Sequence, residues 1–82
     1  MAERMLNPFF EKTKKDFRFA FSKSNDEIEK NSSNQARYFT EYAFKIYQVM
    51  KNVASDLNLE VPLEYSYGLD YLEDKLKILE AQ

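Results

Sequence analysis

Residues 34–57, NQARYFTEYAFKIYQVMKNVASDL, decide the fold of this chain. The main apolar side chains in this stretch recur at steps of 4, 3, 4, 3 and 4, which is the period of one helical face. At about 100° of rotation per residue, they stay within about 40° of one line. These residues are Phe39, Ala43, Ile46, Met50, Val53 and Leu57. The spacing predicts a helix over about 34–57.

Other apolar residues widen this stripe to about half of the helix circumference, by the same rotation. They are Ala36, Tyr38, Tyr42, Tyr47, Val49 and Ala54. An apolar face of that width is typical of a helix surrounded by neighbours, so we place this helix at the centre of a small bundle.

The segment from Asn7 to Phe21 also has helical spacing. Asn7 can cap a helix, and Pro8 suits the first helical position because its missing N–H would be unpaired there. One face of this helix would hold Leu6, Phe10, Phe17 and Phe21. Aromatic residues also occupy every second position of 17–21, so a strand at 17–21 is the alternative.

Residues 22–35, SKSNDEIEKNSSNQ, are nearly all polar, which predicts a connector after the first helix. Ser24 with Glu27 and Ser32 with Gln35 match the spacing of a capping box. We therefore expect one helical turn at about 25–30 and a new helix that begins near Ser33.

The stretch 57–67 alternates apolar residues with polar residues or Pro62, which is typical of a strand. Pro62 would confine such a strand to a sheet edge. We favour an extended connector laid over the bundle, followed by a helix that begins between Pro62 and Gly68 and ends near Leu79. The apolar face of this helix comprises Tyr65, Leu69, Leu72, Leu76 and Leu79.

These patterns predict an all-α fold for residues 1–82, as one domain that forms a bundle of three or four helices with an extended 57–67 connector. The alternative is an α+β fold with a two-stranded sheet from 17–21 and 59–67. A two-stranded sheet is marginally stable without helices packed on it, which disfavours this alternative.

The composition excludes most common catalytic chemistry. The chain has 82 residues with no Cys, His or Trp, and a single Gly cannot build a Gly-rich phosphate loop. Asp70, Glu73 and Asp74 share part of one helical surface, but they fit the start of a helix, where carboxylates interact favourably with the helix dipole. We therefore expect no enzyme and no catalytic, cofactor or metal site.

The chain instead has 7 Phe and 6 Tyr, some of them on the wrong side of their helices. Phe19 lies about 180° from Phe10, and Phe44 lies about 140° from Phe39. The third helix has a similar stripe opposite its core face. The candidate partner-contact residues are Phe19, Phe44, Tyr47, Lys51, Tyr67, Tyr71 and Ile78. Loops or the 57–67 segment could instead cover these residues within a monomer.

Charge is unevenly distributed along the chain. Residues 1–23 have six basic and three acidic side chains, a net charge of +3, whereas residues 52–82 have two basic and seven acidic side chains, a net charge of −5. The two ends could pair within a monomer or between antiparallel subunits. We expect a small protein–protein interaction module that forms a homo-oligomer: an adaptor, inhibitor, accessory subunit, or regulator of the immunity or phage type.

Two other functions have some support in the first helix, where basic residues alternate with Phe17, Phe19 and Phe21. Basic and aromatic side chains together can bind single-stranded nucleic acid, although the net charge of −2 disfavours that partner. A basic, Phe-rich helix could also contact a membrane surface. Residues 1–8 lack an apolar signal core, Ala2 replaces the glycine of a myristoylation site, and no stretch predicts a transmembrane helix, so we expect a cytoplasmic protein.

Overall fold

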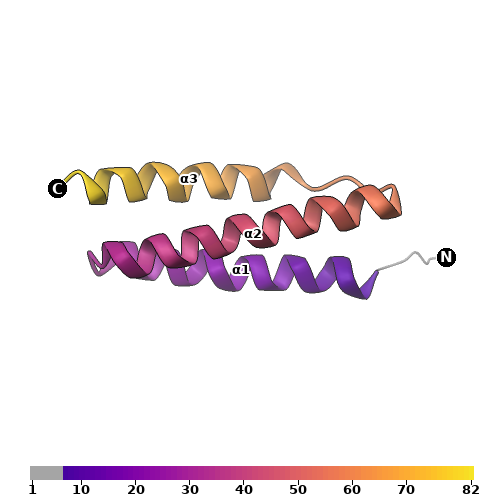
Figure 1. Cartoon of the computed structure of the whole chain (residues 1–82), viewed down its shortest axis with the longest axis horizontal. Helices are drawn as coiled ribbons and strands as arrows, with labels where there is room; N and C mark the ends of the chain where they lie inside the picture. Colours follow the sequence, from indigo (N-terminus) through magenta and orange to yellow (C-terminus); the bar gives the residue numbers. More distant parts are fainter. Residues whose placement is uncertain (1–6) are drawn as a thin grey trace.

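The computed structural model describes residues 7–82, which form three helices joined by two short connectors (Figure 1). The helices are α1 (Pro8–Glu29), α2 (Ser33–Leu57) and α3 (Leu63–Glu80). The all-α prediction is confirmed, and the α+β alternative is not supported, because residues 7–82 contain no strand. Our placement of Leu6 on the first helix and our predictions for Ala2 and the other leading residues lie outside the described part of the chain.

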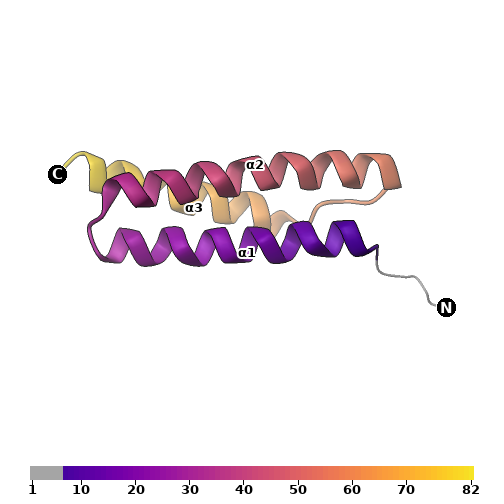
Figure 2. The same ribbon diagram turned by 60° about the horizontal axis from the view of Figure 1, so that its bottom comes forward.

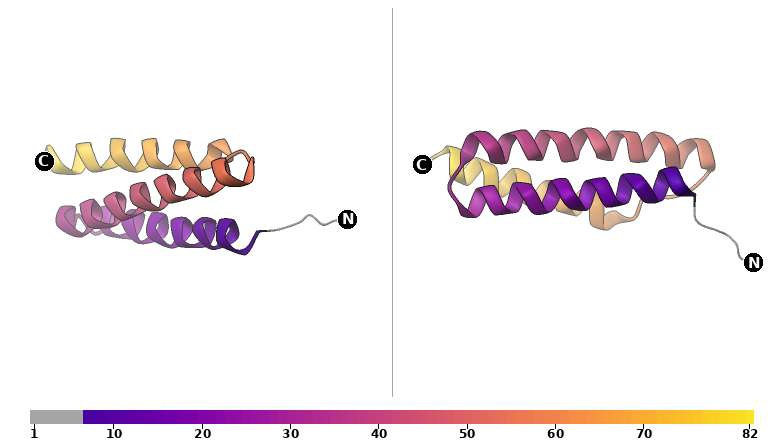
Figure 3. Two further views of the ribbon diagram at one scale, coloured as in Figure 1. Left: turned by 45° about the vertical axis from the view of Figure 1, so that its right-hand side comes forward. Right: turned by 90° about the horizontal axis from the view of Figure 1, so that it is seen from below.

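The helices form an elongated bundle of 51 × 16 × 15 Å. α1 and α2 are antiparallel, and α3 then turns back, so that α3 runs in the same direction as α1 (Figures 1 and 2). α1 and α2 contact each other along most of their length, whereas α3 makes far fewer contacts with either helix. Figure 3 shows α3 crossing behind the α1–α2 pair. The fold is therefore a tight helical hairpin with a third helix laid on it.

The connector predicted over 22–35 is wrong, because α1 continues without a break to Glu29 and only residues 30–32 link it to α2. Ser24 explains the difference. Its side chain is fully buried, its Oγ lies 2.6 Å from the Thr40 hydroxyl, and it donates a hydrogen bond of 3.2 Å to the Ala36 carbonyl. A satisfied polar pair thus fills a core position that usually holds an apolar residue.

The contact between α1 and α2 depends on small side chains. Ala20, Ala36 and Ala43 are completely buried, beside the Ser24–Thr40 pair. Such residues let two helices approach closely. The buried residues of α2 form a narrower arc than the sequence predicted. The prediction that Tyr42 belongs to the core is therefore wrong, since 41% of its surface is exposed. The larger core residues are Phe10, Phe17, Ile46, Met50, Tyr65, Leu69 and Leu72.

Asparagine residues define three of the helix ends. The Asn7 side chain accepts hydrogen bonds from the amides of Phe9 and Phe10, as predicted for a cap. Asn31 and Asn58 adopt left-handed backbone conformations, with φ of 61° and 60°, just after α1 and α2. At both sites the asparagine amide and the next amide bond back to carbonyls of the last turn.

The extended connector is shorter than the predicted 57–67. Leu57 is the last residue of α2, and α3 begins at Leu63, which leaves only residues 58–62 between them. The start of α3 lies within the predicted range, and its end at Glu80 is one residue beyond the predicted Leu79. The alternating residues Leu63, Tyr65 and Tyr67 are therefore helical, with only Tyr65 buried.

Candidate interaction surface

A stripe of exposed apolar residues follows α3 on the side away from its core face. Its members follow each other at steps of four, four and seven residues, which keeps them on one side of a helix. Between 45% and 66% of each side chain is exposed. The residues are Leu63, Tyr67, Tyr71 and Ile78, and we refer to them as the α3 stripe.

The α3 stripe is continuous with the aromatic core through a row of rings. The Tyr71 ring stacks on Phe21 of α1 at 6.0 Å, Phe21 lies 6.4 Å from Phe17, and Phe17 meets the buried Tyr65 edge-on at 5.1 Å. Gly68 permits this arrangement, because a Cβ there would lie 3.3 Å from the Phe21 ring. Aromatic side chains of both helices thus take part in the contact between α1 and α3.

An open groove of about 230 Å³ lies beside these rings, between α1 and α3. Arg18 lines it from α1 and donates a hydrogen bond of 3.3 Å to the Tyr65 hydroxyl, while Glu64 lines it from α3. Arg18 and Glu64 do not form an ion pair with each other or with another residue in 7–82. The groove therefore has one basic and one acidic wall.

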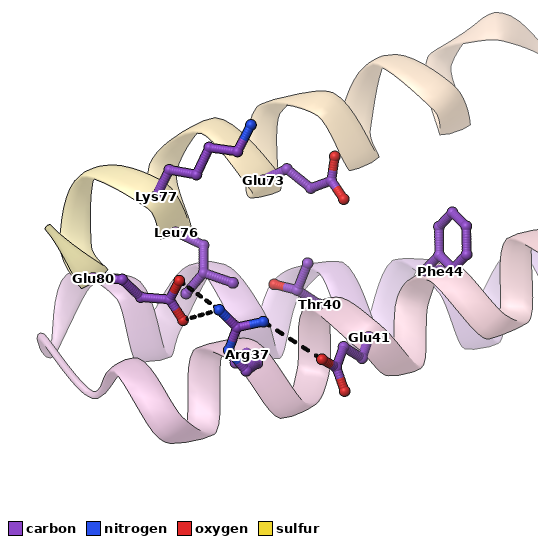
Figure 4. A pocket seen from close by; sticks show the side chains of 8 residues that line it. All are labelled: Arg37, Thr40, Glu41, Phe44, Glu73, Leu76, Lys77 and Glu80. Carbon is purple, nitrogen blue, oxygen red and sulfur yellow. Dashed lines mark hydrogen bonds and ion pairs between the residues drawn. The ribbon is translucent and has the colours of Figure 1, made fainter.

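A second groove, of about 310 Å³, separates the first half of α2 from the last half of α3 (Figure 4). Arg37 closes one end of it by pairing with Glu80 of α3 and with Glu41 of its own helix. The hydrogen bond with Glu80 raises the pKa of Arg37 above its ordinary value. Phe44 stands at the other end of this groove (Figure 4).

The structure separates the predicted contact residues into three places. Tyr67, Tyr71 and Ile78 are together on the α3 stripe. A second group is on α2: Phe44 is about half exposed, and the Lys51 amine lies 5.5 Å from the ring of the half-buried Tyr47. Phe19 is alone on the outer face of α1, with the Lys23 amine 5.8 Å from its ring. The α3 stripe and the α2 group each bring three of the predicted residues together, whereas Phe19 is separate from both.

Several exposed apolar residues were missed by the sequence analysis. Leu63 extends the α3 stripe by one helical turn. It was missed because the alternation of Leu63, Tyr65 and Tyr67 with polar residues predicted an extended segment there. A second patch lies on α2 beside α1, where a groove is lined by residues of α1 and α2 and by none of α3. The exposed apolar residues of this patch are Tyr38, Tyr42 and Val49. Their spacing of four and seven residues places them on one side of the helix, and the sequence analysis assigned that side to the buried face.

The burial of two phenylalanines weakens the case for nucleic-acid binding through α1. Phe17 is only 3% exposed, and Phe21 is half-buried and packs against the rings of both Phe17 and Tyr71. Of the three alternating phenylalanines, only Phe19 remains exposed. Stacking on this segment would thus depend on a single ring.

A scan of protein-family models and searches of curated proteins and solved structures find no match to this chain. Within residues 7–82, no group of three or more acidic side chains is arranged to hold a metal ion. None of the three helices combines the length and apolar composition that a membrane span requires.

Proposed function

We propose that this chain is a small, non-enzymatic protein–protein interaction module that self-associates through the α3 stripe. It would act as an adaptor, inhibitor, regulator or accessory subunit, in a cytoplasmic setting. The observation that carries the proposal is the clustering of Leu63, Tyr67, Tyr71 and Ile78 on one side of α3.

The composition of the stripe supports contact with a protein. Contiguous exposed apolar patches commonly mark interaction sites, and tyrosine is enriched at protein interfaces. Tyr71 is already oriented by the ring of Phe21 and by the Lys75 amine, 5.6 Å from its own ring. A side chain held in this way loses less conformational freedom on binding.

The experiment compares two tyrosines of nearly equal exposure. Tyr67 on the α3 stripe is 64% exposed, and Tyr38 on the α1–α2 side is 62% exposed. Tyr67→Glu should leave helicity by circular dichroism unchanged and should weaken association, measured by sedimentation velocity over a wide concentration range. Tyr38→Glu is the matched control and should associate like the wild-type chain.

Two results would count against the proposal. Equal loss of association in both variants would mean that added charge, rather than the α3 stripe, decides the outcome. A wild-type chain that stays monomeric at high concentration, and from which native mass spectrometry recovers no partner, would remove the basis for an interaction module. Phe44→Glu, in the α2–α3 groove, tests whether that second surface contributes.

A further inference from the structure

The face shared by α1 and α3 has a charge pattern that is complementary to itself. Arg18 and Glu29 are eleven residues apart on α1, so they lie within about 20° of each other on that helix. Glu64 and Lys75 are also eleven residues apart on α3, with the opposite order of charge. None of these four side chains forms an ion pair with another residue of the described chain.

The packing of α1 against α3 determines where these four side chains lie along the bundle axis. α1 and α3 run in the same direction, and the hydrogen bond from Arg18 to Tyr65 relates positions 47 residues apart. Because both helices rise equally per residue, Arg18 is level with Glu64, and Glu29 is level with Lys75, to within about one helical turn. A basic position on one helix therefore lies level with an acidic position on the other, at both ends of the face.

We propose that a second copy of this chain binds to the α1–α3 face, with a two-fold axis parallel to the helices. This inference rests on the proposed function and names its partner. Such an axis keeps every residue at its own level and places α1 of one copy opposite α3 of the other. Arg18 then faces Glu64 of the second copy, and Glu29 faces Lys75, which gives four opposite-charge pairs around the two α3 stripes.

The other symmetric arrangement is disfavoured by charge. A two-fold axis perpendicular to the helices would place α3 opposite α3 in the reverse direction. Asp70 and Asp74, near the middle of α3 and beside the stripe, would then face the same residues of the second copy. The subunits therefore run parallel, in contrast to the antiparallel pairing suggested by the charge of the two chain ends.

The face that α1 and α3 share is small. It is only as long as α3, whose 18 residues span about 27 Å, and with the 16 Å width of the bundle this gives a footprint of about 430 Å². That is about half of the area that each partner buries in a standard interface, so we expect a weak dimer. The α3 stripes of the two copies supply apolar surface along this footprint, and the charged pairs lie towards its two ends. An apolar centre with a polar rim is the usual anatomy of such contacts.

The test is a charge reversal followed by mixing. Arg18→Glu and Glu64→Arg should each weaken dimerisation about tenfold, because each variant converts two exposed opposite-charge pairs into like-charge pairs. The Arg18→Glu chain has acidic side chains at positions 18 and 64, and the Glu64→Arg chain has basic side chains at both positions. In a 1:1 mixture, a dimer of one chain of each kind would therefore have two attractive pairs between positions 18 and 64. Sedimentation equilibrium should therefore show dimer restored in the mixture. Glu29→Lys and Lys75→Glu repeat the test at exposed sites, with helicity as the check on folding.

Each outcome decides the proposal. Variants that dimerise like the wild-type chain would overturn it, and so would weakened variants that stay monomeric when mixed. A wild-type chain that is monomeric by itself would also overturn it. The proposed interaction function has its own test. It would be contradicted if Tyr67→Glu and Tyr38→Glu changed binding, to a second copy or to another partner, by the same amount.

Discussion

The buried hydroxyl pair between α1 and α2 gives the sharpest test of the fold. Ser24 is fully buried, its Oγ is 2.6 Å from Thr40 Oγ1, and it also donates to the Ala36 carbonyl. Ser24→Ala removes both of these bonds, whereas Thr40→Val removes one and leaves Ser24 bonded to Ala36. The two substitutions and their combination form a double-mutant cycle.

The expected magnitudes follow from these bonds. One net intramolecular hydrogen bond contributes about 1 kcal/mol, so Ser24→Ala should lower the free energy of unfolding by about 1–2 kcal/mol and Thr40→Val by about 1 kcal/mol. The double variant replaces both partners by apolar groups of similar shape, so its loss should be smaller than the sum by about 1 kcal/mol. Ser22→Ala, at an exposed position of α1, is the matched control and should change stability by less than about 0.5 kcal/mol.

Urea unfolding followed by circular dichroism at about 222 nm measures all of these variants on one scale. Strict additivity in the cycle would refute the shared bond. Ser24→Leu sharpens the test, because overpacking this tight contact should cost about 1–3 kcal/mol or more. If Ser24→Leu were as stable as the wild-type chain, the segment 22–29 would be a solvated connector and not the end of α1.

Two further predictions concern single residues. Leu72 of α3 is fully buried in the core of the bundle. Leu72→Ala should therefore lower the free energy of unfolding by about 2–5 kcal/mol in the same urea assay. A loss under about 1 kcal/mol would mean that α3 does not pack against the other two helices as described. Asn58 has a left-handed backbone conformation, which alanine adopts less readily than asparagine or glycine. Asn58→Ala should therefore lower the free energy of unfolding by about 1 kcal/mol, whereas Asn58→Gly should not lower it. Equal stability of these two variants would contradict the left-handed conformation.

Periodicity predicted most of the fold correctly. Helix α2 and the face of α3 were predicted well, because large apolar residues mark them at helical spacing. The second half of α1 was missed because its core contact is Ser24, a residue that sequence patterns assign to loops. A polar residue can occupy a core position only when its hydrogen bonds are satisfied, and the partner Thr40 is sixteen residues away.

The candidate surface was predicted in part. Tyr67, Tyr71 and Ile78 were singled out because they lie opposite the core face of their helix, and that argument needs only rotation about one axis. Which other residues join them depends on how closely the helices approach. Tyr42 lies on an open groove beside α1 and stays exposed, and the absence of a side chain at Gly68 allows Phe21 to lie close to α3.

The proposed parallel dimer is tested most directly by cross-linking between chains. The natural chain has no cysteine, so Arg18→Cys and Glu64→Cys each introduce a single thiol. The two variants are mixed in equal amounts, treated with a short bismaleimide and analysed by mass spectrometry, which distinguishes the possible cross-linked products. The parallel dimer predicts that the mixed product, position 18 to position 64, predominates. Products that link like positions in excess, or a purely statistical mixture of all products, would contradict it.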